Sequence, residues 1–444
     1  MSKRISSVVI IIFLTVNLLS CDDKNASNLQ NENAPVVNIH ADNEDHNEKE
    51  QGTVVDYSLI DKYLLENNVS IDMNAEHYDK NLAFLDEEVD SKDIFFTAEV
   101  HGVEANSLLK MQFVKYFKER TNFKYLLTEN SYSASFFLNQ YLLTGDTSIL
   151  DMLFHAQKGT YANSDENYMG WVSLYEYNNT LDVEDRIKVV GVDIEHQVVI
   201  AYNYMISVLP DKEVPAEIEN TVQLIRDTLE TLNSTFTQDH IARKNSNIIL
   251  ENIEEHRDIY QEYLGDELVF FELVNSNVIN AKEAYKHVND KTEWNKVRDQ
   301  MIYDSFLTVD RQLEEGKYYG QWGLNHTFQE AEGQVKWFAA FLNSEGSKYQ
   351  DKVLSIVYNY ENCESMGRGN QDSMTLNIKY PFIENVSSLV EGDTVIYKLN
   401  GDKTDKPFIP MYISWTGEES DIDVSEFFQY ILLIKNSKAS KSRN

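Results

Sequence analysis

Apolar and polar residues follow two alternating periods along most of the chain, starting near residue 54. Short apolar runs such as DIFFTAEV (Asp93 to Val100) and FKYLLTEN are typical of buried parallel strands. Between these two runs, ANSLLKMQFVKYFKERTNF places its large apolar residues at helical spacing. The run DRIKVVGVDIE then reads as a third strand. This order predicts an α/β fold with a mostly parallel central sheet flanked by helices.

A long helical stretch interrupts the alternation between about residues 215 and 316. Segments such as EIENTVQLIRDTLETLNS carry apolar stripes with a period of 3.6 residues. We therefore expect a large helical insertion that caps or lines a cleft. Strand character returns afterwards in KYYGQWGLNHT, KVLSIVYNYE, DTVIYKLNG and FFQYILLIKN.

The N-terminus has the pattern of an exported lipoprotein. Two basic residues precede an apolar stretch from Val8 to Leu19, which is too short and wrongly flanked for an ordinary membrane-spanning helix. The run LLSC, ending at Cys21, resembles a bacterial lipobox; the alternative is a plain signal peptide followed by an unrelated cysteine. We expect residues 1–20 to be a lipoprotein signal peptide and Cys21 to be lipidated. The predicted location is the bacterial cell envelope, where the protein is lipid-anchored at the outer membrane or on the periplasmic face.

Residues 21–52 are rich in Asn, Glu and Asp and contain almost no large apolar side chain. Such a segment cannot bury enough surface to offset its ordering entropy, so we expect a disordered tether. One folded domain is then predicted at residues 53–444. The chain carries 39 Lys and Arg against 73 Asp and Glu, a net charge of -34, so we expect no nucleic-acid partner.

Polar side chains close several of the predicted strands. Ligands bind at the carboxyl ends of parallel strands, so residues at these ends are candidates for chemistry. A single histidine there is more often a structural residue, but here the pattern recurs on strand after strand. The residues concerned are Glu99 with His101, Glu129 with Asn130, Asp193 with Glu195 and His196, and Asn325 with His326. Glu195 and His196 also suit the cap of the helix that follows them.

The chemistry of this cluster follows from the near-neutral pKa of histidine. A neutral imidazole held by a carboxylate can take a proton from water, and the resulting hydroxide can attack a carbonyl. Glu99 and His101 project to the same side of an extended strand, and Glu129 is an equally good orienting partner. The same three groups are ordinary ligands of Zn, Mn or Fe. Residue types alone leave both mechanisms open.

A family resemblance adds to this interpretation. The run AEVHGVEANSLLKMQFVKYFKERTNFKYLLTEN resembles the N-terminal motif of the erythromycin esterase family. Later segments fit in order: VVGVDIE resembles the family's third strand, VRDQMIYDSFLTVDRQL its Arg-Asp helix, and YYGQWGLNHTF its tryptophan-containing strand with an Asn-His pair. The resemblance spans roughly Asp93 to the C-terminus. It implies a hydrolase that cleaves a small-molecule ester or lactone, and the N-terminal signal predicts that this hydrolase is exported.

The resemblance also implies roles for single residues. By position, it implies that His101 is the general base that activates water and that Glu99, Lys110 and Glu129 support it. We further expect Arg298 or His326 to steady the developing oxyanion. The substrate-binding residues implied or expected at the cleft are Lys110, Asp193, Asn325 and Trp322.

The chain departs from the family motif at several positions. One residue separates Glu99 from His101 where the family usually has two, and Lys110 stands where arginine is typical. Leu324 replaces the first histidine of the last motif. Macrolide hydrolysis, and with it a role in antibiotic resistance, is therefore left open.

The shortened motif also resembles a wider superfamily that includes haem-binding uptake lipoproteins and metal-dependent Tiki-type peptidases. A haem- or metal-binding uptake lipoprotein and a metal-dependent peptidase are therefore the alternatives to the esterase. The favoured prediction requires no cofactor. The alternatives require haem or a divalent metal, with His101, Glu99 and Glu129 as the metal ligands.

Overall fold

The computed structural model describes residues 55–234, 239–367, 371–401, 406–412 and 419–443. The predicted signal peptide, the tether and the lipidation site at Cys21 lie outside the described residues. Among the helices that are described, none is long and apolar enough to cross a membrane. The predicted division of the chain into a signal peptide (1–20), a tether (21–52) and a folded domain (53–444) therefore stays a prediction.

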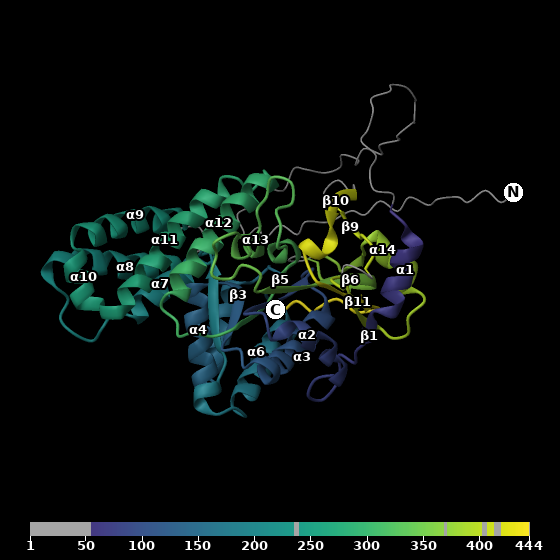
Figure 1. Ribbon diagram of the computed structural model, residues 1–444. Coiled ribbons are helices and arrows are strands. Elements are labelled where there is room, and N and C mark those ends of the chain that lie inside the picture. The colour runs from purple at the N-terminus through teal and green to yellow at the C-terminus, as the bar shows by residue number, and fades with distance from the viewer. Residues whose placement is uncertain (1–54, 235–238, 368–370, 402–405, 413–418, 444) are drawn as a thin grey trace, which may run out of the picture.

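A nine-stranded sheet forms the centre of the protein (Figure 1). Its order is β1-β8-β11-β6-β2-β5-β3-β4, with β7 paired to β6. The pairs from β11 through β6, β2, β5 and β3 to β4 are all parallel, whereas β1, β7 and β8 pair antiparallel. The strands are β1 (Asn68–Ser70), β2 (Ile94–Glu99), β3 (Tyr125–Ser131), β4 (Lys188–Asp193), β5 (Tyr318–Gly323), β6 (Val353–Ser365), β7 (Met374–Ile378), β8 (Thr394–Lys398) and β11 (Tyr430–Lys435). A separate two-stranded sheet joins β9 (Pro410–Tyr412) and β10 (Glu419–Asp423).

Helices cover both faces of this sheet, which confirms the predicted α/β class. They are α1 (Tyr57–Glu66), α2 (Asp86–Val89), α3 (Glu104–Thr121), α4 (Tyr132–Thr144), α5 (Thr147–Ala156), α6 (Asp165–Asn178), α7 (Val198–Ser207), α8 (Ala216–Ser234), α9 (Asp239–Glu255), α10 (Arg257–Leu264), α11 (Leu268–Tyr285), α12 (Lys291–Asp310), α13 (Phe338–Leu342) and α14 (Pro381–Ser387).

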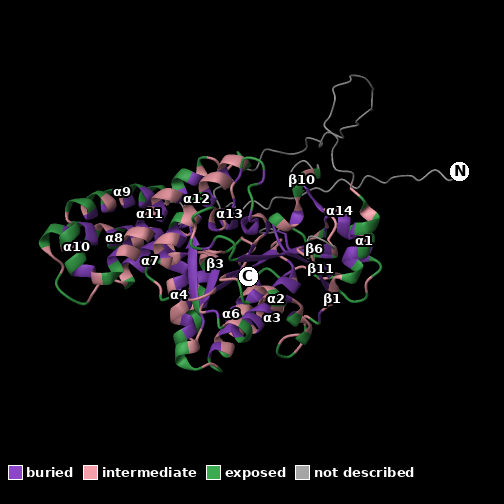
Figure 2. Ribbon diagram, in the orientation of Figure 1, coloured by how far each residue is buried: buried purple, intermediate pink, exposed green. Residues whose placement is uncertain are grey.

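Alternate residues of β2 show how the two layers are built. Phe95 stacks on Phe117 of α3, with 4.5 Å between ring centroids, on one face of the sheet. Phe96 packs on the other face, edge-on to Trp322 and to Phe338 of α13. Because successive side chains of a strand point to opposite faces, a strand buried on both faces must be apolar throughout. Figure 2 shows the buried residues concentrated along the strands and on the helix surfaces that meet them.

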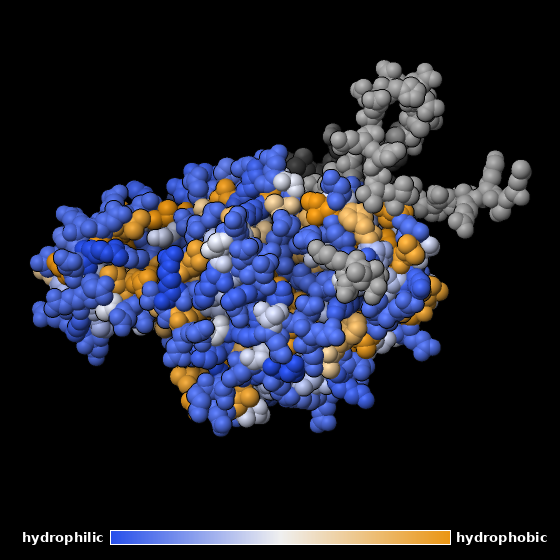
Figure 3. Space-filling model, viewed as in Figure 1, coloured by the Kyte–Doolittle hydropathy of each residue, from blue (hydrophilic) through white to orange (hydrophobic). Residues whose placement is uncertain are grey.

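Between β4 and β5 the chain is helical, from α7 to α12. Helices α8, α9 and α10 extend beyond the β4 edge of the sheet, at the left of Figure 1. Helix α12 returns to pack against β4, so it carries its residues to the end of the sheet where the polar strand ends lie. The face of the molecule seen in Figure 3 is largely hydrophilic, as expected for a chain with a net charge of -34.

Candidate active site

The site is built at the point where β2 ends. The strand stops at Glu99, and the chain turns at Gly102, whose φ of 85° lies in the left-handed region that favours glycine. The turn leaves His101 beside Glu99, with 2.8 Å between His101 Nδ1 and Glu99 Oε1. A carboxylate only accepts hydrogen bonds, so the Nδ1 atom of His101 carries the proton. The Nε2 atom of the neutral ring is then free to take a proton.

Glu129, at the end of β3, faces the other side of the same imidazole. Its Oε2 atom is 4.0 Å from His101 Nε2 and accepts a hydrogen bond from the Gly323 amide at 2.8 Å. Its Oε1 atom is buried and has no hydrogen-bond partner among the described residues. The His101 side chain is 19% exposed, so water can reach the ring from the cavity described below.

Arg298 of α12 holds the carboxylates of Asp193 and Glu129 on the side away from the cavity. It donates from Nε to Asp193 Oδ1 at 3.0 Å and from Nη2 to Asp193 Oδ2 at 2.6 Å, which is a bidentate ion pair. Its Nη2 atom also lies 3.6 Å from Glu129 Oε1. Arg298 Nη1 donates to His326 Nε2 at 3.1 Å, and His326 Nδ1 lies 2.7 Å from Asp299 Oδ1. This buried network fixes the position of Glu129.

The charges set the pKa values of the two central groups. Burial alone would lower the pKa of His101, but the hydrogen bond and charge of Glu99, together with the charge of Glu129, raise it above its ordinary value of 6.5. Burial alone would raise the pKa of Glu129, but His326, His101 and Arg298 hold it below its ordinary value. Glu129 is therefore ionised at neutral pH.

A cavity of about 160 Å³ opens in front of His101. Lys110 lines it from α3, and its Nζ atom lies 4.7 Å from the centre of the Trp171 ring. Burial lowers the pKa of Lys110, while the charge of Glu99 opposes this shift. The other lining groups are mostly hydroxyls and amides, among them Ser107, Asn130, Asn167 and Gln321.

Gln321 is a site residue that the sequence reasoning missed. It lies on β5, donates a hydrogen bond to Glu99 Oε2 and lines the cavity. It therefore holds the carboxylate that in turn holds His101. A polar residue inside the apolar strand YYGQWG is the signal that could have identified it.

Three predicted substrate-binding residues lie away from the cavity. Trp322 is fully buried and its Nε1 atom donates to the Leu127 carbonyl at 2.9 Å, so it is a core residue. Asn325 donates to Glu332 Oε2 at 3.1 Å, and Asp193 is enclosed behind Arg298. These placements correct the predictions for all three.

The residues after β4 also differ from expectation. Glu195 accepts hydrogen bonds from the Ser133 amide at 3.2 Å and the Ser133 hydroxyl at 2.6 Å. It therefore caps the first turn of α4 and does not cap α7, the helix that follows Glu195 in the chain. Burial raises the pKa of Glu195 to about 7. His196 contacts Asp193 and Tyr285 instead of capping α7.

The helical insertion does not line the cavity. The lining residues of the described chain come from β2, the turn after it that carries His101, β3, β5, α3, α6, the loop before α6 and the C-terminal segment. The insertion contributes to the site through Arg298 and Asp299 of α12, which stand behind Glu129. This corrects the expectation that it caps or lines the cleft.

The predicted metal ligands do not converge on one point. Glu99 is bonded to Nδ1 of His101, whereas Glu129 faces Nε2 on the opposite side of the ring. Across the described residues, no three His, Cys, Asp or Glu side chains form a group that could hold a metal ion. The Glu99, His101 and Glu129 set therefore does not fit a three-ligand metal site in this geometry.

A C-terminal segment, residues 437–443, closes one wall of the cavity. The Ser440 amide donates to the Gly102 carbonyl at 2.8 Å, and the Glu104 amide donates to the Lys438 carbonyl at 2.9 Å. Further along, the Asp165 amide donates to the Lys441 carbonyl at 2.8 Å. The segment thus ties the turn after β2 to the start of α6.

Proline at position 440 would have no amide hydrogen to donate to the Gly102 carbonyl. Because a small misplacement of a catalytic group is costly, we expect Ser440→Pro to lower kcat/KM for the reaction at this site by about tenfold to a hundredfold. The matched control is Ser440→Ala, which keeps the amide and should retain activity. Steady-state kinetics and thermal melting of both variants would check this. Equal kcat/KM for the proline variant and wild type would contradict it.

Comparisons with known proteins bear on the fold. No protein-family model matches the chain, and no curated protein matches its sequence. Solved structures do match. A crystal structure of a protein from Bacillus cereus is 18% identical, covers 88% of this chain and 100% of its own, and has a TM-score of 0.63.

Two further structures share the fold. A succinoglycan biosynthesis protein is 15% identical, with 87% of this chain and 98% of that chain covered and a TM-score of 0.61. A mutant erythromycin esterase in its open conformation is 11% identical, with 85% and 99% covered and a TM-score of 0.59. At these identities the likeness concerns the fold alone. The chain therefore has the erythromycin esterase-like fold that its sequence motifs predicted.

Proposed function

We propose that the protein is a hydrolase that cleaves a carboxylic ester or lactone with water activated by His101. The observation that carries the proposal is the arrangement of Glu99, His101 and Glu129. Glu99 holds the Nδ1 proton, which leaves Nε2 directed toward the cavity with Glu129 4.0 Å away. The erythromycin esterase that shares the fold supports the same class of reaction.

The reaction follows from these positions. A water molecule between the substrate carbonyl and His101 loses a proton to Nε2, and its oxygen forms a bond to the carbonyl carbon. The tetrahedral intermediate then collapses, the bond to the alcohol oxygen breaks, and the imidazolium returns its proton to the leaving alkoxide. The products are a carboxylic acid and an alcohol. Glu99 stabilises the imidazolium throughout, because its carboxylate contacts Nδ1.

Lys110 is the group best placed to stabilise the oxyanion. Its ammonium lines the cavity, whereas Arg298 is 2% exposed and donates to Asp193 and His326. Arg298 and His326 therefore act through Glu129 and not on the substrate. This revises the oxyanion role first expected for them.

The size of the cavity favours a small reacting group. Pockets that enclose drug-sized ligands are about 300–1,000 Å³, whereas this cavity is about 160 Å³. A short acyl ester or small lactone fits this volume better than a whole macrolide. The membrane anchor at Cys21 and the envelope location rest on the N-terminal sequence.

The test is turnover of a panel of short acyl esters, lactones and one macrolide by the purified protein, with and without chelator. We expect hydrolysis of the small members and no effect of chelator. Activity abolished by chelator would point to the metal-dependent peptidase alternative. A folded protein that hydrolyses nothing would overturn the proposal, and a Soret band in that preparation would favour the haem-binding alternative.

A further inference from the structure

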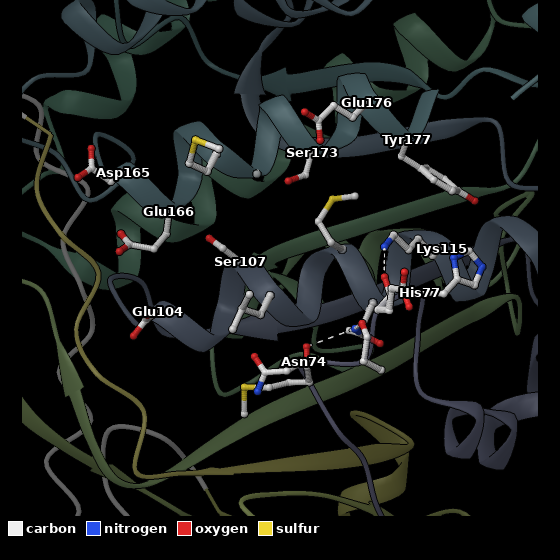
Figure 4. Close-up of a pocket in the computed structure, with 18 of the residues that line it drawn as sticks. Asn74, His77, Glu104, Ser107, Lys115, Asp165, Glu166, Ser173, Glu176 and Tyr177 are labelled. Carbon is white, nitrogen blue, oxygen red and sulfur yellow. Dashed lines mark hydrogen bonds between the residues drawn. The ribbon is translucent and has the colours of Figure 1, made fainter. Parts of the chain in front are cut away.

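A second and larger hollow lies outside the candidate active site. It has a volume of about 790 Å³ and runs between α3, α6 and the loop Met73–His77. Figure 4 shows the two helices side by side, with Glu104 and Glu166 near one end of the hollow and Lys115 and Tyr177 near the other. We call it the α3/α6 groove. Ser107 lines both this groove and the active-site cavity.

Apolar side chains are left exposed in the groove. Leu108 is 41% exposed and Met169 is 54% exposed, although both belong to well-formed helices. Met73 and Met111 add to the same lining. Leaving such groups in water is unfavourable, and flexible methionines are over-used on surfaces that bind partner helices. The groove therefore has the composition of a protein-binding surface.

Carboxylates surround these apolar residues. Glu76, Glu104, Asp165, Glu166 and Glu176 line the groove. Within the described part of the chain, the side chains of Glu76, Glu104 and Glu176 make no ion pair. The opposing cations are fewer. Lys115 donates to the Glu76 carbonyl at 3.1 Å, Lys441 lines the rim, and His77 is paired with Glu119.

Helix stability does not account for all of these acids. Glu104 and Glu166 lie in the first turns of α3 and α6, where the helix dipole favours a negative charge. Glu176 lies in the last turn of α6, where the same dipole opposes it. A negative charge at that position is explained better by a cationic partner than by the fold.

We propose that the α3/α6 groove binds a basic amphipathic helix supplied by another protein. The lining of α3 extends from Glu104 to Lys115, which is about 17 Å at 1.5 Å per residue, or about three helical turns. A third helix laid between two others can place apolar residues at i, i+3, i+4 and i+7 on Leu108, Met111 and Met169. Its basic residues would then meet the carboxylates of the rim.

The experiment measures binding of a labelled amphipathic peptide of about 14 leucines and lysines to the full chain by fluorescence anisotropy. A scrambled peptide of equal charge and an amphipathic peptide of leucines and glutamates are the comparison probes. We expect saturable binding of the first peptide only, and weaker binding as salt is raised. Leu108→Asp and Met169→Asp should each weaken it at least tenfold.

Leu143→Asp is the matched control, because Leu143 is 74% exposed on α4 and does not line the groove. It should bind the peptide as wild type does, and thermal melting should show all variants folded. No binding to wild type, equal binding of the scrambled or acidic peptide, or equal weakening by Leu143→Asp would each overturn the proposal. Ester hydrolysis is measured separately, so this result is independent of the proposed reaction.

Discussion

Replacing Arg298 by methionine is expected to lower the free energy of unfolding by about 3–5 kcal/mol. The guanidinium makes two hydrogen bonds to Asp193 and lies 3.6 Å from Glu129. Asp193 is buried and the Glu129 side chain is only 13% exposed, so the substitution leaves poorly compensated charge inside the protein. Urea denaturation of the variant and wild type at pH 7 measures the difference.

Arg257→Met is the control for this experiment. Arg257 makes a comparable pair with Glu272, but its side chain is 58% exposed, and exposed pairs are worth about 0–1 kcal/mol. An equally small decrease in the free energy of unfolding for both variants would contradict a major contribution of the Arg298 network to stability. Arg298→Lys should fall between methionine and wild type, because an ammonium keeps the charge and loses the bidentate fork.

The effect of Arg298 should depend on pH with a definite sign. Burial alone would raise the pKa of Asp193, but Arg298 and His196 lower it well below its ordinary value. A depressed carboxylate pKa contributes stability above the unfolded value of about 4, and this is lost as pH falls through the folded pKa. The difference in the free energy of unfolding between wild type and Arg298→Met should therefore persist at pH 5 and become smaller below about pH 4. A difference that widens in acid would contradict this cause.

His101→Gln is expected to lower kcat/KM by about 10²–10⁴-fold without unfolding the protein. The glutamine amide can still donate to Glu99, but it cannot take a proton from water. The rate of hydrolysis of the best ester of the panel measures the loss of activity, and thermal melting shows whether the variant is folded. His77→Gln is the control, because His77 pairs with Glu119 at the surface, outside the active-site cavity. Retained activity in His101→Gln would exclude His101 as the base.

Part of the site could be predicted because it depends on strand ends. Glu99 and Glu129 each close an apolar run, and the carboxyl ends of parallel strands meet at one edge of a sheet. Gly145 follows the end of α4 with a φ of 72°, and glycine is the usual residue at a helix end of this conformation. Such local signals need no knowledge of distant contacts.

Other features depend on strand parity and on long-range pairing. Gln321 and Trp322 are neighbours on β5 and point to opposite faces, so the amide reaches Glu99 while the indole enters the core. The sequence does not say which face of that strand meets the cavity. The contact of Ser440 with Gly102 joins residues 338 positions apart, and the segment around it has no periodic pattern.

The pH dependence of kcat/KM for wild type and Glu99→Gln shows whether neutral His101 activates the water. If neutral His101 is the base, wild-type activity rises with pH through a midpoint above 6.5, because Glu99 and Glu129 raise the pKa of His101. Removing the Glu99 charge should move that midpoint to lower pH and reduce the plateau. An unchanged midpoint in Glu99→Gln, or activity that falls as pH rises through this range, would contradict water activation by His101.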